Sequence, residues 1–227
     1  MAFVSLLLIW SKIPFSCDII FLMKIYKDND QKFAIETLLI FLLPVLLVYY
    51  GIVPERFRMI ALVVVSLAVL FIVFREKWSF SDLGIRVDNI KKGFLLYGSL
   101  TLVGVVAIAY YAQRVGLGSI FDIKPSTYLL LTFFPISFFQ EFLYRGFLMK
   151  MLQSVFSDRM TVVLFNASLF TILHIIFPLP SVMLPLAFIG GLYFAICYYL
   201  VPNLILVSIS HAILNLTAVA LGFFVII

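Results

Sequence analysis

Seven long apolar runs, separated by short charged stretches, constrain the fold of this 227-residue chain more than any other feature. A helix that spans the hydrocarbon core of a bilayer, about 30 Å thick, needs roughly 20 predominantly apolar residues. The runs have about this length and lie approximately at 33–51, 57–74, 94–113, 126–149, 161–177, 182–200 and 204–226. Charged residues make up only 12% of the chain, about half the share in an average soluble domain. We therefore predict an all-α fold, a polytopic membrane helical bundle with seven or eight transmembrane helices.

The eighth candidate segment is Met1 to Met23, which is interrupted by Lys12 and Asp18. It is compatible with a spanning, interfacial or re-entrant segment. A cleaved signal peptide is not predicted, because no cationic region precedes its apolar run and no small-residue cleavage site follows. No repeat or linker divides the chain, so we expect a single integral-membrane domain over residues 1–227.

The basic residues predict the orientation of the bundle, because cytoplasmic loops are enriched in Lys and Arg. The loops on one side hold Lys24, Lys27, Lys32, Arg75, Lys77, Arg86, Lys91, Lys92, Lys150 and Arg159, and those on the other hold Arg56, Arg58, Arg114 and Lys124. The first side is predicted to be cytoplasmic. The net charge is +5, but the basic residues are scattered along the chain and form no basic stripe, so no nucleic-acid partner is expected. We predict an integral, multi-pass membrane protein that lies in the lipid bilayer. If the source is prokaryotic, this is the cell membrane.

The C-terminal stretch from Met160 to Ile227 contains no Asp, Glu, Lys or Arg, yet it holds both histidines of the protein, His174 and His211. Ionisable groups are costly inside a bilayer, so they tend to face a protein interior or a water-filled cavity and to mark function. Each histidine is therefore a candidate functional residue.

Two of the predicted helices contain the remaining polar candidates. The fourth holds Gln140, Glu141 and Arg145, and the seventh holds Asn215 four residues after His211. Residues four apart share a helix face, so Glu141 is the expected ion-pair partner of Arg145, and His211 is expected beside Asn215.

These side chains provide two chemical functions that peptide-bond hydrolysis needs. A carboxylate with a histidine can take a proton from water, and a second histidine with an amide can stabilise an oxyanion. Glu141, His174 and His211 would also suit a catalytic zinc ion. Their spacing differs from the helical zinc signature of two histidines four apart, so we expect no cofactor and treat zinc as the minor alternative.

The order Gln140-Glu141-x-x-x-Arg145, Phe170-x-x-x-His174, His211-x-x-x-Asn215 resembles the CPBP family of CAAX proteases and bacteriocin-processing enzymes, also called Abi. The family pattern is Glu-Glu-x-x-x-Arg, Phe-x-x-x-His and His-x-x-x-Asn or Asp on separate transmembrane helices. The likeness covers roughly residues 129–215, within a catalytic core of about 126–226.

The resemblance implies an intramembrane endopeptidase that acts on a membrane-anchored or prenylated peptide or protein. A glutamate of the first motif and His174 would activate water, and His211 with Asn215 would bind the oxyanion. Family precedent favours a metal-free, glutamate-dependent mechanism.

Gln140 departs from the family pattern, which usually has the first of two glutamates at this position. That glutamate is the one usually assigned to water activation, and glutamine cannot accept the proton. Either Glu141 serves as the base, or the chain is a naturally inactive relative or an engineered Glu-to-Gln form.

A non-catalytic alternative also fits the sequence: an immunity or scaffold protein that retains the fold. In that case Glu141 and Arg145 would be only a neutralised pair, and the histidines and Asn215 would join helices by hydrogen bonds. The sequence does not identify the substrate, whether it is prenylated, or the oligomeric state.

Overall fold

The computed structural model describes residues 28–117, 127–177 and 179–223, and within them the chain forms only helices and loops. The α-helices are α3 (Asp28–Thr37), α4 (Leu43–Tyr49), α5 (Arg58–Arg75), α6 (Ile90–Arg114), α7 (Thr127–Glu141), α8 (Met149–Val155), α9 (Arg159–Leu173), α10 (Pro180–Leu200) and α11 (Leu204–Ala220). Two π-helical stretches, η1 (Leu38–Leu42) and η5 (Phe142–Leu148), join α3 to α4 and α7 to α8 without a break. Short 3-10 turns are η2 (Glu55–Phe57), η3 (Ser81–Leu83) and η6 (His174–Ile176). The all-α prediction is confirmed.

Five helical stretches of the described residues are long and apolar enough to cross a membrane: Lys32–Tyr49, Glu55–Arg75, Ile90–Arg114, Arg159–Ile176 and Pro180–Leu200. Leu204–Ala220 is a shorter apolar helix. The prediction of an integral, multi-pass membrane protein is thereby confirmed. A count of seven or eight is compatible with these helices but stays a prediction, and the candidate segment from Met1 to Met23 lies outside the described residues.

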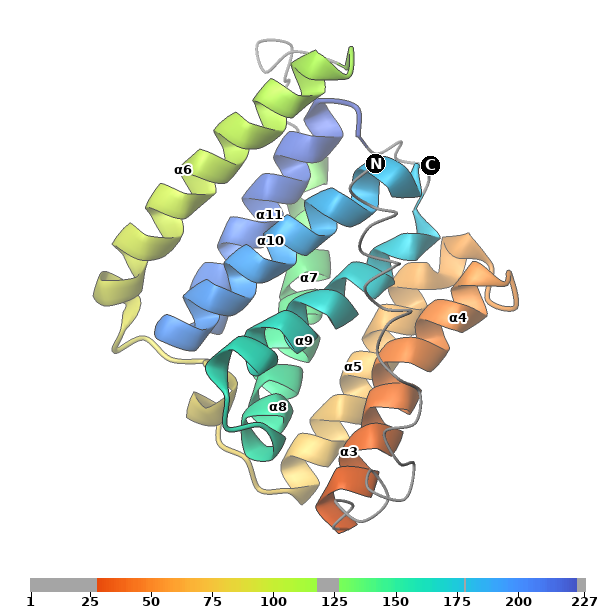
Figure 1. Ribbon diagram of the computed structural model, residues 1–227, viewed down its shortest axis with the longest axis vertical. Coiled ribbons are helices and arrows are strands. Elements are labelled where there is room, and N and C mark those ends of the chain that lie inside the picture. Colours follow the sequence, from red (N-terminus) through yellow and green to blue (C-terminus); the bar gives the residue numbers. More distant parts are fainter. Residues whose placement is uncertain (1–27, 118–126, 178, 224–227) are drawn as a thin grey trace, which may run out of the picture.

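The helices that contain the candidate residues pack at the centre of the bundle (Figure 1). Helix α11 packs between α6 and α7, and α10 packs along α9. Helices α4 and α5 cover the other side, where they contact η6 and α7. This packing brings α7, α9 and α11 together although their residues are far apart in the sequence.

Side-chain caps fix the starts of α9, which leads into the turn with His174, and of α11, which contains His211. The Asp158 carboxylate accepts a hydrogen bond from Thr161 N at 2.7 Å and caps α9. The Asn203 side chain accepts one from Leu206 N at 3.0 Å and caps α11. Such caps satisfy backbone donors that a helix start leaves unpaired, so they define the residue at which each helix begins.

The loop between α5 and α6 is docked onto the bundle. Leu83 is buried, and the Gly84 carbonyl accepts a hydrogen bond from Leu204 N at 2.7 Å. Gly84 has φ +70°, and a Cβ there would lie 2.3 Å from the Tyr198 hydroxyl, so only glycine fits. The loop thus helps to fix the first turn of α11.

A salt bridge ties the same loop to α8. Lys150 Nζ lies 2.8 Å from Asp82 Oδ1 and 4.7 Å from the Trp78 ring centroid. The hydrogen bond from Lys150, assisted by hydrogen bonds from Ser79, lowers the pKa of the Asp82 carboxyl to about 2. The carboxylate is therefore charged at all physiological pH values.

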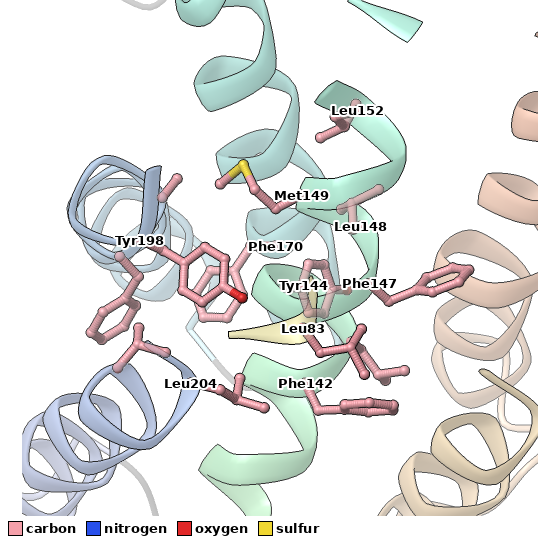
Figure 2. Close-up of a cluster of buried hydrophobic side chains, with 14 of the residues drawn as sticks. Leu83, Phe142, Tyr144, Phe147, Leu148, Met149, Leu152, Phe170, Tyr198 and Leu204 are labelled. Atoms are coloured by element: carbon pink, nitrogen blue, oxygen red, sulfur yellow. The ribbon is translucent and has the colours of Figure 1, made fainter. Parts of the chain in front are cut away.

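The main apolar core surrounds the π-helical stretch η5, all seven residues of which are buried (Figure 2). Phe142, Tyr144 and Phe147 from η5 pack with Phe170 of α9 and with Leu83 of the loop. Dense packing on every side of η5 leaves its residues little freedom to move. The element that contains Arg145 is therefore held rigidly.

Candidate active site

Glu141 and Arg145 form a fully buried ion pair at the junction of α7 and η5. Both side chains have 0% exposure. Arg145 Nη1 donates to Glu141 Oε1 at 3.3 Å, and Arg145 Nε lies 3.3 Å from Oε2 without hydrogen-bond geometry. The pair spans the start of the π-helix, a type of distortion that is frequent at functional sites.

The Arg145 guanidinium is fixed by aromatic rings and a backbone carbonyl. Its Cζ lies 4.4 Å from the Phe170 ring centroid and 5.3 Å from that of Phe194. Nη2 donates to the Gly191 carbonyl at 2.9 Å. These contacts offset part of the cost of burying a cation, because ring faces and carbonyl oxygens both carry partial negative charge.

Gly191 allows α10 to approach the arginine. A Cβ at this position would lie 3.1 Å from the Phe170 ring and 3.3 Å from the Ala167 backbone. A Cβ at the neighbouring Gly190 would meet only Phe194, at 4.0 Å. The close approach of α9 and α10 at Gly191 thus places the carbonyl acceptor of Arg145.

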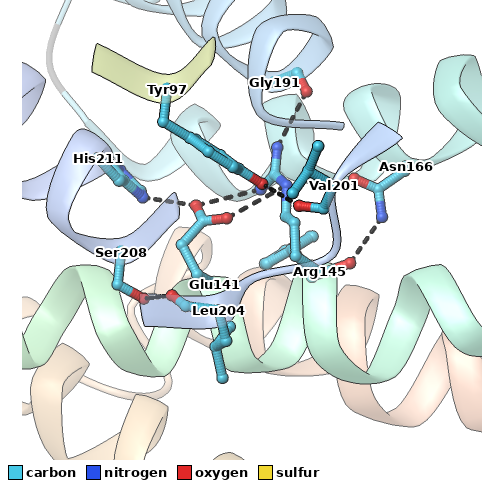
Figure 3. Close-up of polar contacts among 10 residues, drawn as sticks. Tyr97, Glu141, Arg145, Asn166, Gly191, Val201, Leu204, Ser208 and His211 are labelled. Carbon is cyan, nitrogen blue, oxygen red and sulfur yellow. Dashed lines mark hydrogen bonds and ion pairs between the residues drawn. The ribbon is translucent and has the colours of Figure 1, made fainter. Parts of the chain in front are cut away.

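His211 binds the carboxylate of Glu141 directly (Figure 3). Its Nδ1 lies 2.6 Å from Glu141 Oε1, and its side chain is 4% exposed. The carboxylate accepts, so Nδ1 carries the hydrogen. The other ring nitrogen, Nε2, then serves as an acceptor when the imidazole is neutral and as a donor when it is protonated.

His174 lies at the C-terminal end of α9, in the short turn η6. Its Nδ1 donates to the Phe170 carbonyl at 2.9 Å, which leaves Nε2 with the lone pair in the neutral ring. Its ring centroid is 4.8 Å from that of Phe170, and the His211 centroid is 5.6 Å from the same ring. The two imidazoles therefore pack against one phenylalanine, the first residue of the Phe170-x-x-x-His174 motif.

Asn215 and Gln140 complete the set of predicted site residues. Asn215 is half-buried, and its Nδ2 donates to Ser137 Oγ of α7 at 3.2 Å. Gln140 is 8% exposed and makes no hydrogen bond within the described part of the chain. The structure thus brings Glu141, Arg145 and His211 into direct contact, places His174 beside them through Phe170, and joins Asn215 to α7.

Two side chains that support this arrangement, the Asn166 amide and the Ser137 hydroxyl, were not predicted from the sequence. Asn166 is fully buried, and its Nδ2 donates to the Tyr144 carbonyl of the π-helix at 2.6 Å. Ser137, also fully buried, holds Asn215. A lone amide within the apolar run of α9, eight residues before His174, was the signal that could have identified Asn166.

The arrangement combines a charge-neutral ion pair with two imidazoles and a carboxamide. The imidazole Nε2 atoms are the groups that can exchange protons, and the carboxamide can donate hydrogen bonds to an oxygen anion. Among the described residues, no group of three or more His, Cys, Asp and Glu side chains has the proximity that a metal ion requires. Glu141, His174 and His211 therefore do not form a preassembled zinc-ligand set in this conformation.

The candidate residues fall within a segment similar to a known protein family. Residues 122–217 match the family described as type II CAAX prenyl endopeptidase Rce1-like. Neither a curated protein nor a solved structure matches the chain. The matched segment includes every predicted site residue, from Gln140 to Asn215. Through this segment, the chain is similar to the Rce1-like family of CAAX prenyl endopeptidases, in agreement with the resemblance to CAAX proteases that the sequence motifs predicted.

Proposed function

We propose that this chain hydrolyses a peptide bond in a membrane-anchored or prenylated substrate, with catalysis by side chains of α7, α9 and α11. The observation that supports this proposal best is the convergence of three elements on one buried polar cluster. Glu141 contacts His211 at 2.6 Å, and both histidine rings pack against Phe170. A simple helix-joining role does not require these groups to share one location.

In the proposed reaction, an imidazole nitrogen is the proton acceptor. His174 donates its Nδ1 hydrogen to a backbone carbonyl, so its Nε2 lone pair is available to take a proton from water. The resulting hydroxide attacks the carbonyl carbon of the scissile bond, and the proton then passes to the leaving amine. Glu141 is engaged by Arg145 and by His211, so it acts mainly to orient His211.

Stabilisation of the tetrahedral intermediate falls to His211 and Asn215. His211 can donate from Nε2 only when both of its ring nitrogens carry hydrogen, with the Nδ1 hydrogen on Glu141. Asn215 Nδ2 has a second hydrogen besides the one directed to Ser137. Removal of one such donor typically lowers kcat by about 100- to 1000-fold.

The decisive experiment is a cleavage assay on the purified, lipid-reconstituted protein with prenylated and unprenylated peptides. His174→Ala and His211→Ala are expected to abolish cleavage. Ile172→Ala and Ile209→Ala are matched controls, because these residues lie on the same helices and are 40% exposed. Turnover by both histidine variants at the rate of the controls would refute the assignment.

A substitution at Gln140 distinguishes an active form of the enzyme from a disabled one. It lies one residue before Glu141, is buried, and has no hydrogen-bond partner among the described residues. If water activation in this site needs a second carboxylate, Gln140→Glu will raise the cleavage rate by orders of magnitude. An unchanged or lower rate would support a native mechanism that uses Glu141 and His174.

Two further measurements test the remaining alternatives. A zinc mechanism requires bound metal by elemental analysis and inhibition by chelators. A non-catalytic immunity or scaffold role requires full biological function of the His174→Ala, His211→Ala double variant. Metal-free protein with chelator-resistant activity would exclude the first, and loss of function in the double variant would exclude the second.

A further inference from the structure

An apolar groove separates α4 and α5 from the elements that contain the candidate active site. Its empty volume is about 490 Å³, a figure that includes the space open to the surroundings. Its walls include Val45 and Val48 of α4, Ala61 and Val65 of α5, and Tyr144 of η5. Leu173 and Ile176, which lie before and after His174 in the sequence, also line it. Arg58 is the single charged residue among the groove residues, all of which belong to the described part of the chain.

Arg58 has no anionic partner among the described residues. It is half-buried, and no described carboxylate lies within ion-pair distance of it. Its Cζ lies 5.4 Å from the Phe177 ring centroid, a contact that leaves the guanidinium donors available. Five N–H donors in a planar fork suit the oxygens of a phosphate group.

The position of Arg58 along α5 is that of a lipid headgroup. Helix α5 has 18 residues from Arg58 to Arg75, which corresponds to about 27 Å at 1.5 Å per residue. The hydrocarbon core is about 30 Å thick, so the two arginines lie near its opposite boundaries. Lipid phosphates lie at this level, and the groove extends from Arg58 into the depth that acyl chains occupy.

The helix surfaces beside the groove are already lipid-facing. Leu43 and Leu46 on α4, and Ile60 and Val64 on α5, each expose more than 40% of their surface. Acyl chains are the medium at these surfaces. A chain that enters the groove gains apolar contacts while its phosphate stays within reach of Arg58.

We propose that this groove binds one phospholipid, with an acyl chain packed between α4 and α5 on one side and Tyr144 and Leu173 on the other, and with the phosphate on the Arg58 guanidinium. The bound chain packs against Tyr144 and Leu173, the residues directly before Arg145 and His174. The lipid therefore supports the wall behind the buried ion pair. The proposal does not depend on peptidase activity.

The test is native mass spectrometry of the full chain titrated with phosphatidylglycerol. We expect one tightly retained lipid on the wild type and binding about tenfold weaker or worse for Arg58→Gln, because a charge-assisted hydrogen bond is lost. Arg56→Gln is the matched control, since Arg56 lies over Phe57 and does not line the groove. It is expected to bind as the wild type does.

A second pair of variants keeps the proposal testable if one protein is unstable. Ala61→Phe fills the groove with Arg58 intact and is expected to displace the lipid. Arg58→Lys keeps the charge without the planar fork and is expected to bind between the wild type and Arg58→Gln. Equal binding by Arg58→Gln and the wild type, equal losses in Arg58→Gln and Arg56→Gln, or displacement of the lipid by a prenylated peptide would each overturn the assignment.

Discussion

Replacement of Arg145 by methionine removes the cation that neutralises Glu141 in a fully buried position. The carboxylate would keep its hydrogen bond from His211 but lose its charge partner, and the Gly191 carbonyl would lose its donor. Loss of one partner of a buried ion pair typically costs about 3–5 kcal/mol, because an uncompensated charge remains in a medium of low dielectric constant. We expect Arg145→Met to destabilise the protein by that amount.

The double variant Glu141→Leu, Arg145→Met separates this electrostatic cost from the loss of packing. With both charges removed, the site holds apolar side chains of similar volume, and such replacements are often close to neutral. We therefore expect the double variant to be more stable than Arg145→Met alone, by about 2 kcal/mol or more. In the double-mutant cycle, the loss of stability in the double variant would then be smaller than the sum of the losses in the two single variants.

The measurement is the free energy of unfolding in mixed micelles for the wild type, the two single variants and the double variant. Arg159→Met is a matched control: Arg159 is exposed, lies 5.1 Å from the Tyr199 ring centroid, and is expected to contribute less than about 1 kcal/mol. Strictly additive single-variant effects, or an Arg145→Met cost as small as the control, would refute the buried-pair argument.

Three further predictions concern the elements that hold the site. Gly191→Ala should destabilise the protein by about 1–3 kcal/mol through overpacking, while Gly190→Ala should have little effect, as thermal unfolding would show. Asn203→Ala should cost about 1–2 kcal/mol because the cap of α11 is lost, and Asn203→Ser should recover part of it in the same assay. The Asp82–Lys150 pair should add at most about 1 kcal/mol to stability, since both side chains are partly exposed. This contribution should be full above pH 3.8 and should disappear as the pH falls toward 2 and Asp82 takes up a proton. Asp82→Asn should abolish this pH dependence of the melting temperature.

The fold class could be predicted from the sequence because bilayer thickness and apolar run length are directly related. Within the described residues, each of the seven apolar runs overlaps a helix, and the polar side chains stand out against a nearly charge-free background. The π-helix η5 could not be predicted, because its residues Phe142–Leu148 show no local signal such as proline. Its backbone depends on tertiary contacts, among them the hydrogen bond from Asn166 to the Tyr144 carbonyl.

Rotational position was predictable on individual helices but not between them. A spacing of four placed Glu141 near Arg145, and the π-helical turn preserves that contact. The same spacing suggested a shared role for His211 and Asn215, yet their polar partners are Glu141 and Ser137, both on α7. Which residues of α7 face α11 depends on helix packing, which sequence periodicity alone does not specify.

The charges at the site also bear on the meaning of Gln140. Glu141 is the one carboxylate of the described residues in contact with the histidines, and Arg145 already balances its charge. A second carboxylate at position 140 would be a buried charge without a cation of its own among the described residues. Such a group is most easily accommodated as a neutral acid, or as a base that accepts a proton during the reaction. Gln140→Glu should therefore lower stability, and it should raise the cleavage rate only if water activation in this site needs a second carboxylate. A rise in activity without a loss of stability would mean that another cation reaches this position.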